Sequence, residues 1–326
     1  MNLPETILIR LPAAAAAVLA LALVSLLIGA SDLSPLALLF PHAEHALDVV
    51  LISRLPRTLA LILAGMSMAV AGLIMQALTQ NRFVEPSTAG TVESASLGLL
   101  VVLLLAPDLP VIAKMLVASA FALCGTALFL RILSLVPLRS PLTVPLVGIV
   151  LGGIISAVTT FFAYRYDLLQ SLNAWTTGDF SGVLRGRYEL LWIAFALTVL
   201  AYLAADRLTV AGMGRDFTTN LGLSYRGTVA LGLIVVSSVT ASIVVTVGTI
   251  PFLGLVVPNV VSLIAGDNMR RTLAWVAVLG AGLVLVCDIV GRVIHHPFEI
   301  PIGTMMGIVG SALFLILLLR GRERLA

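Results

Sequence analysis

The chain has 326 residues, of which 60% are hydrophobic and 11% are charged, and its mean hydropathy is +1.13. Soluble domains carry about 25% charged residues, so this chain has too few polar side chains to cover a surface that faces water. Its net charge of +3 comes from basic residues spread singly along the chain, which leaves nucleic acid no basic patch to bind. The composition therefore excludes a soluble domain and predicts an all-α polytopic membrane protein.

Ten apolar runs are predicted to be membrane helices within a single transmembrane domain, residues 1–326. Backbone groups in lipid must be hydrogen-bonded within the protein, so runs of this length indicate helices. The first run follows Arg10 and is longer than the roughly 7–15 apolar residues of a signal peptide, so we interpret it as a membrane helix. The predicted spans are residues 11–30, 55–78, 88–105, 111–133, 143–164, 188–205, 228–248, 250–266, 272–292 and 302–319.

The basic residues predict the orientation of these spans. If the N-terminus is inside, 12 of the 19 basic residues fall at cytoplasmic ends of the spans and 7 fall outside. The positive-inside rule therefore places both termini in the cytoplasm.

Two polar connections are longer than the others. Residues 166–187 are external in this topology, and residues 206–227 form the longest cytoplasmic connection. The cytoplasmic connection is interpreted as short helices that lie against the membrane and dock a soluble partner. An ordinary solvated loop is the alternative.

No set of catalytic residues is recognisable. The sequence contains no phosphate-binding loop and no nucleophile with a nearby base, so any energy source must be another subunit. Cys124 and Cys287 both lie in apolar runs, where they imply packing and no disulfide. The chain is therefore expected to be no enzyme and to hold no cofactor.

Polar side chains inside the predicted spans are the candidates for a pathway. Ser156, Thr159, Thr160 and Tyr164 are spaced so that they share one face of the fifth span. They line a pathway, or alternatively their hydroxyls bond their own backbone. Glu93 lies near the start of the third span, where it serves either a function or the helix dipole.

Three arginines lie at external helix ends. Arg292 is four residues after Asp288, so the two can form an ion pair on one helix face. Arg54 and Arg57 flank a proline and have few acidic residues near them in the sequence. Their guanidinium groups suit carboxylates of a docking partner, and anchoring at the membrane interface is the alternative.

All four histidines fall on the external side, namely His42, His45, His295 and His296. Together they raise the alternative of a site where a transition metal enters the protein. The spacing is not specific for a metal, and no metal site is predicted.

Several short motifs follow one another along nearly the whole chain. They are Arg54-Leu-Pro-Arg57, Gly72 and Gln76 before Asn81, Pro86 and Gly90, Trp175-Thr-Thr-Gly178, Leu221-Gly222, Phe252-Leu-Gly-Leu-Val-Val-Pro258, Asp288 with Arg292, and Glu299-x-Pro301-x-Gly303. Their order resembles the FecCD family of ABC-transporter permeases, which import ferric siderophores, haem and cobalamin.

The sequence of the polar hairpin points to one branch of this family. It reads Asn81-Arg-Phe-Val-Glu-Pro86, whereas proline and leucine commonly follow the asparagine in the family. This hairpin sequence is similar to that of a branch that serves ferric siderophores, often of catecholate type. It argues against cobalamin as the substrate. Asn259 stands where many members have histidine.

The resemblance implies a type II ABC importer permease in a bacterial inner (plasma) membrane. Its partners would be a second permease subunit, two cytoplasmic ATPase subunits and a periplasmic or lipid-anchored siderophore-binding protein. A heterodimer of permeases is favoured over a homodimer.

The resemblance also assigns roles to residues of this sequence. Docking of the binding protein falls to Arg54, Arg57 and Arg292. The cytoplasmic gate comprises Asn81, Phe83, Pro141, Leu142 and Thr143. The pathway comprises Ser156, Thr159, Thr160 and Tyr164. Coupling to the ATPase falls to Gly214, Asp216, Leu221 and Gly222.

Three alternatives remain open. One is a permease for another chelate, such as haem or cobalamin. A permease for first-row metal ions would use the external histidines. A secondary transporter would need buried charges for ion coupling, and the predicted spans hold almost none beyond Glu93.

Overall fold

The computed structural model describes residues 3–28, 48–136, 143–266, 268–294 and 298–322. All regular secondary structure in these residues is helical. The helices are α1 (Leu3–Leu27), α3 (Leu55–Thr79), α4 (Thr91–Leu105), α5 (Val111–Leu133), α6 (Thr143–Arg165), α7 (Leu169–Thr176), α8 (Leu191–Leu203), α9 (Ala205–Gly212), α10 (Arg215–Asn220), α11 (Tyr225–Val247), α12 (Leu253–Ala265), α13 (Met269–Ile294) and α14 (Ile302–Arg322). A π-helical turn (Val50–Arg54) precedes α3, and a 3₁₀ turn (Pro86–Ala89) precedes α4.

The all-α prediction is confirmed, and each predicted span corresponds to a helix. Six helices in the described residues are long and apolar enough to cross a membrane, and α8 with α9 makes a seventh if the pair is one span. Three shorter apolar helices lie at Leu11–Leu27, Thr91–Leu105 and Leu253–Ala265. The chain is a multi-pass membrane protein.

The sixth span ends near residue 205, as predicted, at a bend of 68° between α8 and α9 near Ala204. Within residues 166–187, the eight residues of α7 form a helix that was not predicted. The prediction of short helices in residues 206–227 is confirmed by α9 and α10.

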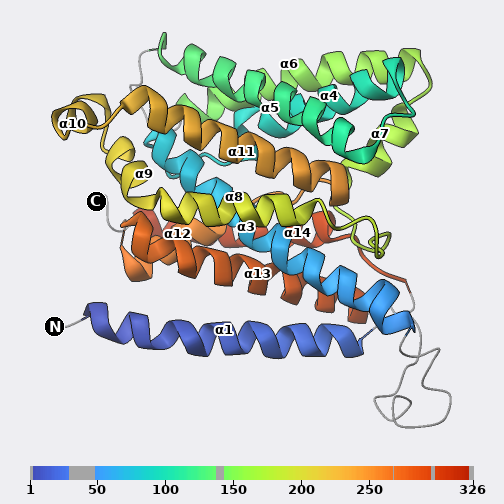
Figure 1. Ribbon diagram of the computed structural model, residues 1–326, viewed down its shortest axis with the longest axis horizontal. Coiled ribbons are helices and arrows are strands. Elements are labelled where there is room, and N and C mark those ends of the chain that lie inside the picture. The colour runs from blue at the N-terminus through green and yellow to red at the C-terminus, as the bar shows by residue number, and fades with distance from the viewer. Residues whose placement is uncertain (1–2, 29–47, 137–142, 267, 295–297, 323–326) are drawn as a thin grey trace.

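Helix α3 is the centre of the bundle. It runs diagonally between α13 and α11 in Figure 1, and 78% of its most apolar stretch is buried. Glycines allow its backbone to approach its neighbours closely, since a methyl group at Gly72 would lie 2.0 Å from the carbonyl oxygen of Gly254 in α12. A methyl group at Gly65 would lie 2.8 Å from the carbonyl oxygen of Gly280 in α13. Small residues hold helices together in lipid in this way.

The outer helices flank this core on two sides. Helix α1 packs against α13, and α4, α5 and α6 form a layer on the opposite side of the bundle (Figure 1). Only 28% of the apolar stretch of α6 and 33% of that of α5 are buried. These two helices therefore present apolar surface to lipid or to a second subunit.

The two ends of the bundle carry different elements. The start of α1 and the end of α14 lie at the same end as α9 and α10 (Figure 1), which is called the α9–α10 end. Helix α7 and the start of α3 lie at the opposite end (Figure 1), which is called the α7 end.

Candidate functional site

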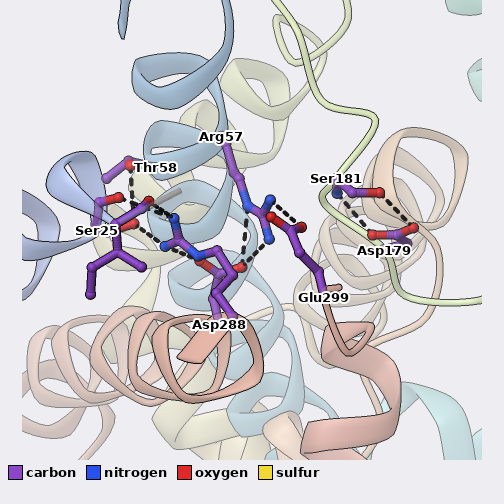
Figure 2. A network of polar contacts seen from close by, with 9 residues as sticks. Ser25, Arg57, Thr58, Asp179, Ser181, Asp288 and Glu299 are labelled. Carbon is purple, nitrogen blue, oxygen red and sulfur yellow. Dashed lines mark hydrogen bonds and ion pairs between the residues drawn. The ribbon is translucent and has the colours of Figure 1, made fainter. Parts of the chain in front are cut away.

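An ion-pair network lies at the α7 end of the bundle, where α3 begins. Arg57 reaches two carboxylates: its Nη2 atom lies 2.6 Å from Oδ1 of Asp288, and its Nη1 atom lies 2.6 Å from Oε2 of Glu299 (Figure 2). The Asp288 side chain is fully buried, and the Glu299 side chain is 22% exposed. Arg57 therefore joins α3 to α13 and to the segment that leads into α14.

The second positively charged partner of Asp288 is Arg292, one turn further along α13. Arg292 forms an ion pair with Asp288 and donates hydrogen bonds to the Ser25 carbonyl (3.1 Å) and the Ser25 hydroxyl (2.7 Å). It also donates to the carbonyl of Ile28 at 2.5 Å. The prediction that Asp288 and Arg292 pair is confirmed.

Arg54 completes this end of α1. Its guanidinium donates to the carbonyl oxygens of Leu26 at 2.9 Å and Leu27 at 3.1 Å. The last carbonyls of a helix have no partner within the helix, and positive charge is favourable beside them. Arg54 and Arg292 therefore satisfy the end of α1, and both side chains are buried.

Arg57 finds its acidic partners in distant parts of the sequence. Its partners lie 231 and 242 positions further along the sequence, so sequence proximity does not reveal them. The docking role of the three arginines stays a prediction. The structure adds that each of them also holds helices of this chain together.

The polar hairpin between α3 and α4 folds back onto the bundle. The side-chain carbonyl oxygen of Asn81 accepts a hydrogen bond from the Phe83 backbone N–H at 2.8 Å, and Asn81 is buried. The Phe83 ring meets the Phe314 ring of α14 edge to face, with centroids 6.1 Å apart. Asn259 of α12 donates to the Arg82 carbonyl at 2.7 Å, which ties the hairpin to that helix.

Glu85 anchors the other half of the hairpin. Its Oε1 atom accepts hydrogen bonds from the Phe252 backbone N–H at 2.9 Å and from the Ser87 hydroxyl at 2.5 Å. The carboxylate thereby sits at the N-terminus of α12, where the helix dipole favours negative charge. Glu85 lies within residues 80–90, outside the helices that are long enough to span a membrane. Its burial raises the pKa of the carboxyl group to about 7.

The predicted coupling segment lies at the α9–α10 end. Gly214 and Gly222 bracket α10 with φ angles of +105° and +76°, which only glycine adopts readily. Asp216 is exposed in the first turn of α10, and Leu221 is 57% exposed. Met213 and Phe217 of the same segment are also exposed, and several exposed apolar side chains together, unlike a single one, mark an interaction site.

A side chain connects the coupling segment to the hairpin. The Gln80 amide, at the end of α3, donates a hydrogen bond to the Gly212 carbonyl at the end of α9, at 3.1 Å. Gln80 has a φ of +50°, which marks the point where the helix stops and the hairpin begins. This hydrogen bond therefore links the end of α9 to the start of the hairpin.

The polar stripe of α6 faces partly outward. Ser156, Thr160 and Tyr164 are exposed, whereas Thr159 is buried and bonds the carbonyl of Ile155 at 2.8 Å. The self-bonding alternative therefore describes Thr159 only. The Ser156 and Thr160 hydroxyls have no hydrogen-bond partner within the described residues.

A small pocket lies between this stripe and α4. Its volume is about 210 Å³, and Glu93, Ser156, Thr160 and Asn173 are among its lining residues. Glu93 stands in the first turn of α4, as the alternative based on the helix dipole expects. The pathway role of the stripe stays a prediction.

Several predicted positions cannot be placed. Pro141, Leu142 and the four histidines lie outside the described residues. Thr143 is the half-buried first residue of α6. Within the described ranges there is no group of three or more histidine, cysteine or acidic side chains able to hold a metal ion.

Three structurally important residues were not assigned a role from the sequence. Glu85, Asn259 and Gln80 act through partners between 132 and 177 positions away. A structural role for Glu85 could have been predicted, because an isolated acidic residue in an apolar chain needs a partner when it is buried. Asn259 was noted only as a departure from histidine.

The architecture defines a class of protein. Apolar helices surround a core with an ion-pair network at one end, short helices at the other and a polar pocket between. These features define a multi-pass integral membrane protein.

The comparisons assign the family. The profile of the FecCD transport family matches residues 17–320. The petrobactin import system permease protein YclN of Bacillus subtilis (strain 168) is 49% identical over 300 residues, which cover 92% of this chain and 95% of that protein. The ferric-anguibactin transport system permease protein FatD of Vibrio anguillarum is 42% identical over 299 residues, covering 92% and 95%.

A solved structure of a metal-chelate type ABC transporter in an inward-facing conformation superposes with a TM-score of 0.80. It is 23% identical, and the match covers 97% of this chain and 99% of that one. The chain belongs to the FecCD transport family and is a transport subunit rather than an enzyme. The resemblance drawn from the motifs is confirmed.

Proposed function

We propose that this chain is the transmembrane permease subunit of an ATP-driven importer for a ferric siderophore of catecholate type. The observation that carries the proposal is the match with the petrobactin permease over 92% of the chain. The hairpin sequence Asn81-Arg-Phe-Val-Glu-Pro86 supports assignment to the ferric-siderophore branch of the family.

The α7 end is proposed to receive the siderophore-binding protein. Arg57 has a side chain that is 13% exposed beside Glu299, and its guanidinium can exchange one carboxylate for another at low cost. Arg54 and Arg292 are buried and hold the end of α1, so they would act by fixing the position of Arg57. Among the three arginines, Arg57 would therefore contact the binding protein, and Arg54 and Arg292 would position it.

The α9–α10 end is proposed to seat an ATPase subunit. Leu221 offers an exposed apolar contact, and Gly214 and Gly222 fix the turn on each side of α10. Closure of two ATPases would displace α10 and α9. The Gln80–Gly212 hydrogen bond would pass this displacement to the hairpin.

The hairpin is proposed to form the cytoplasmic gate together with Thr143. Phe83 packs against Phe314, and Asn81 holds the turn that presents the ring. An aromatic contact between α14 and the hairpin can break and reform without exposing charge, which suits a gate. Pro141 and Leu142 belong to the same proposal by position in the sequence.

The pathway is proposed to run along the outer face of α6. Ser156, Thr160 and Tyr164 give this face weak polarity, and its apolar remainder calls for a second permease subunit on the other side. We favour a heterodimer. The assembly would lie in a bacterial inner (plasma) membrane with both chain termini in the cytoplasm, in keeping with the 12 basic residues on that side.

Uptake of labelled iron tests this function. A deletion strain complemented with this gene and its partner genes is offered a ferric catecholate siderophore or, separately, free ferric salt and zinc. Rescue by the chelate alone, lost when the ATPase is inactivated, is the expected result. Rescue by free metal would overturn the proposal in favour of a metal-ion permease.

Docking is tested by the affinity of the binding protein for the assembled transporter in nanodiscs. Arg57→Gln should weaken this affinity, whereas Arg187→Gln, at an exposed position of the same end, should leave it unchanged. Arg57→Glu is a poor choice, because it would place a third carboxylate beside Asp288 and Glu299. Unchanged affinity in folded Arg57→Gln would remove the docking role.

A further inference from the structure

The pocket between α4 and α6 holds a buried polar atom that has no partner. Within the described residues, the Oε2 atom of Glu93 makes no hydrogen bond. The exposed Ser156 and Thr160 hydroxyls and the exposed Asn173 side-chain amide make none either. This Oε2 atom is fully enclosed and still unpartnered. Buried polar atoms without partners are uncommon, and each one points to a missing ligand or water.

The protein makes room for this carboxylate. A methyl group added at Gly152 of α6 would lie 3.3 Å from Cδ of Glu93 and 3.4 Å from its Oε2 atom. Glycine at this position therefore lets α6 pass over the carboxylate, and any larger residue would press on it. The neighbouring Gly153 meets nothing within 4 Å, so the close approach is specific to position 152.

The pocket carries negative charge without a positive partner in its lining. Glu93 is its only ionisable lining residue, and the other polar lining groups are hydroxyls and one amide. A carboxylate among hydroxyl oxygens matches a group that is positively charged and donates several hydrogen bonds, which describes a protonated aliphatic amine. The pocket has no group of three acidic, histidine or cysteine side chains for a metal ion.

The pocket is too small for a whole iron chelate but large enough for part of one. Its volume of about 210 Å³ is below the roughly 300–1,000 Å³ of pockets that enclose drug-sized ligands. A second hollow of about 370 Å³ shares Asn173, Thr176 and Thr249 with it and continues to Gly303 at the start of α14. The two hollows together lead from the α7 end toward Glu93.

We propose that this pocket is a transit site that binds a protonated amine of the siderophore backbone through Glu93, and that it selects amine-bearing cargo. The inference rests on the proposed function, since it assumes a siderophore that passes along α6. The bulky iron–catecholate part would remain in the wider pathway while the amine occupies the pocket. The oxygen of Ser156 or Thr160 would accept a hydrogen bond from the N–H group that remains on a secondary ammonium.

The test uses two chelates that differ only at the amine. One is a ferric bis-catecholate whose linker carries a secondary amine that is protonated at pH 7, and the other is the same compound with that amine acetylated. Initial uptake rates of labelled iron are measured for both with the complete transporter in proteoliposomes. The wild type is expected to transport the amine-bearing chelate faster.

Glu93→Gln keeps the shape of the side chain and removes its charge. A hydrogen bond to a charged group is strong enough that its loss should slow uptake of the amine-bearing chelate by about tenfold. Uptake of the acetylated chelate should not change. Gly152→Ala should shift the ratio in the same direction, because it displaces the carboxylate, and Gly153→Ala should not.

Asp108→Asn is the matched control, because Asp108 is an exposed carboxylate just beyond the other end of α4. Basal ATP hydrolysis and the amount of inserted protein show whether each variant has folded. Equal slowing of both chelates by Glu93→Gln, or an unchanged ratio, would overturn the transit site while leaving the siderophore permease intact. A wild type that transports neither chelate would instead refute the proposed function.

Discussion

Arg57→Gln should destabilise the folded protein far more than Glu299→Gln, although both substitutions break the same ion pair. Without Arg57, the fully buried Asp288 keeps only Arg292 as a counter-charge, and breaking a buried pair costs about 3–5 kcal/mol. Without Glu299, Arg57 still bonds Asp288, and the lost pair is partly exposed, so the cost is about 1 kcal/mol or less.

The assay is thermal unfolding of the purified protein in nanodiscs. Since 1 kcal/mol corresponds to roughly 2–4 °C in a domain of 150–250 residues, the lower limit of the cost predicts a fall in Tm of roughly 6–12 °C for Arg57→Gln. The same conversion predicts a fall of at most roughly 2–4 °C for Glu299→Gln. Arg270→Gln is the matched control, because Arg270 pairs with Asp206 where both side chains are 62% exposed. This control should leave Tm unchanged.

Two results would refute the reasoning. A loss of Tm in Glu299→Gln as large as in Arg57→Gln would show that burial of Asp288 does not decide the cost. An equal loss in Arg270→Gln would show that any arginine pair of this chain has the same value, whatever its exposure.

Three further predictions concern packing, pH and coupling. Gly72→Leu should prevent accumulation of the folded protein in membranes, because even a methyl group at Gly72 would collide with the backbone of α12, while Gly153→Ala should accumulate normally. The pKa of Glu85 is raised from 4.5 to about 7, so the folded state binds more protons than the unfolded chain in this window, and Tm should fall as pH rises from 5 to 8. Glu85→Gln should flatten that slope, and an unchanged slope would show that another group titrates. Gln80→Ala should lower siderophore uptake while ATP hydrolysis continues, as measured in proteoliposomes, and parallel loss of both activities would contradict a coupling role.

The sequence predicted the helices well because the property that drives insertion is local. An apolar run must be helical in lipid, and this holds for α5 and α6 without knowledge of their neighbours. The end of the sixth span near Ala204 was predicted because the polar residues Asp206 and Arg207 follow it directly. Helix α7 was missed because it is short and half polar, and its environment comes from surrounding elements.

The candidate site was predictable only where its parts are close in the sequence. Asp288 and Arg292 are one turn apart, so their pairing followed from helix geometry. The partners of Arg57 are more than 230 positions away, and nothing local indicates them. Glu93 was found as an isolated charge, whereas nothing local in the sequence indicates that Gly152 makes space for it.

The burial of the hairpin has a consequence for how this segment tolerates change. Ordinary connections lie on the surface and accept inserted residues, and the turn at residues 107–110 is exposed in this way. Val84, Glu85 and Pro86 are instead as buried as the helices that they join. An epitope tag or a protease cleavage sequence can therefore be placed between α4 and α5, but the same insertion after Phe83 would have to displace α12. For the placement of tags, and for natural variation in loop length, the hairpin is part of the core.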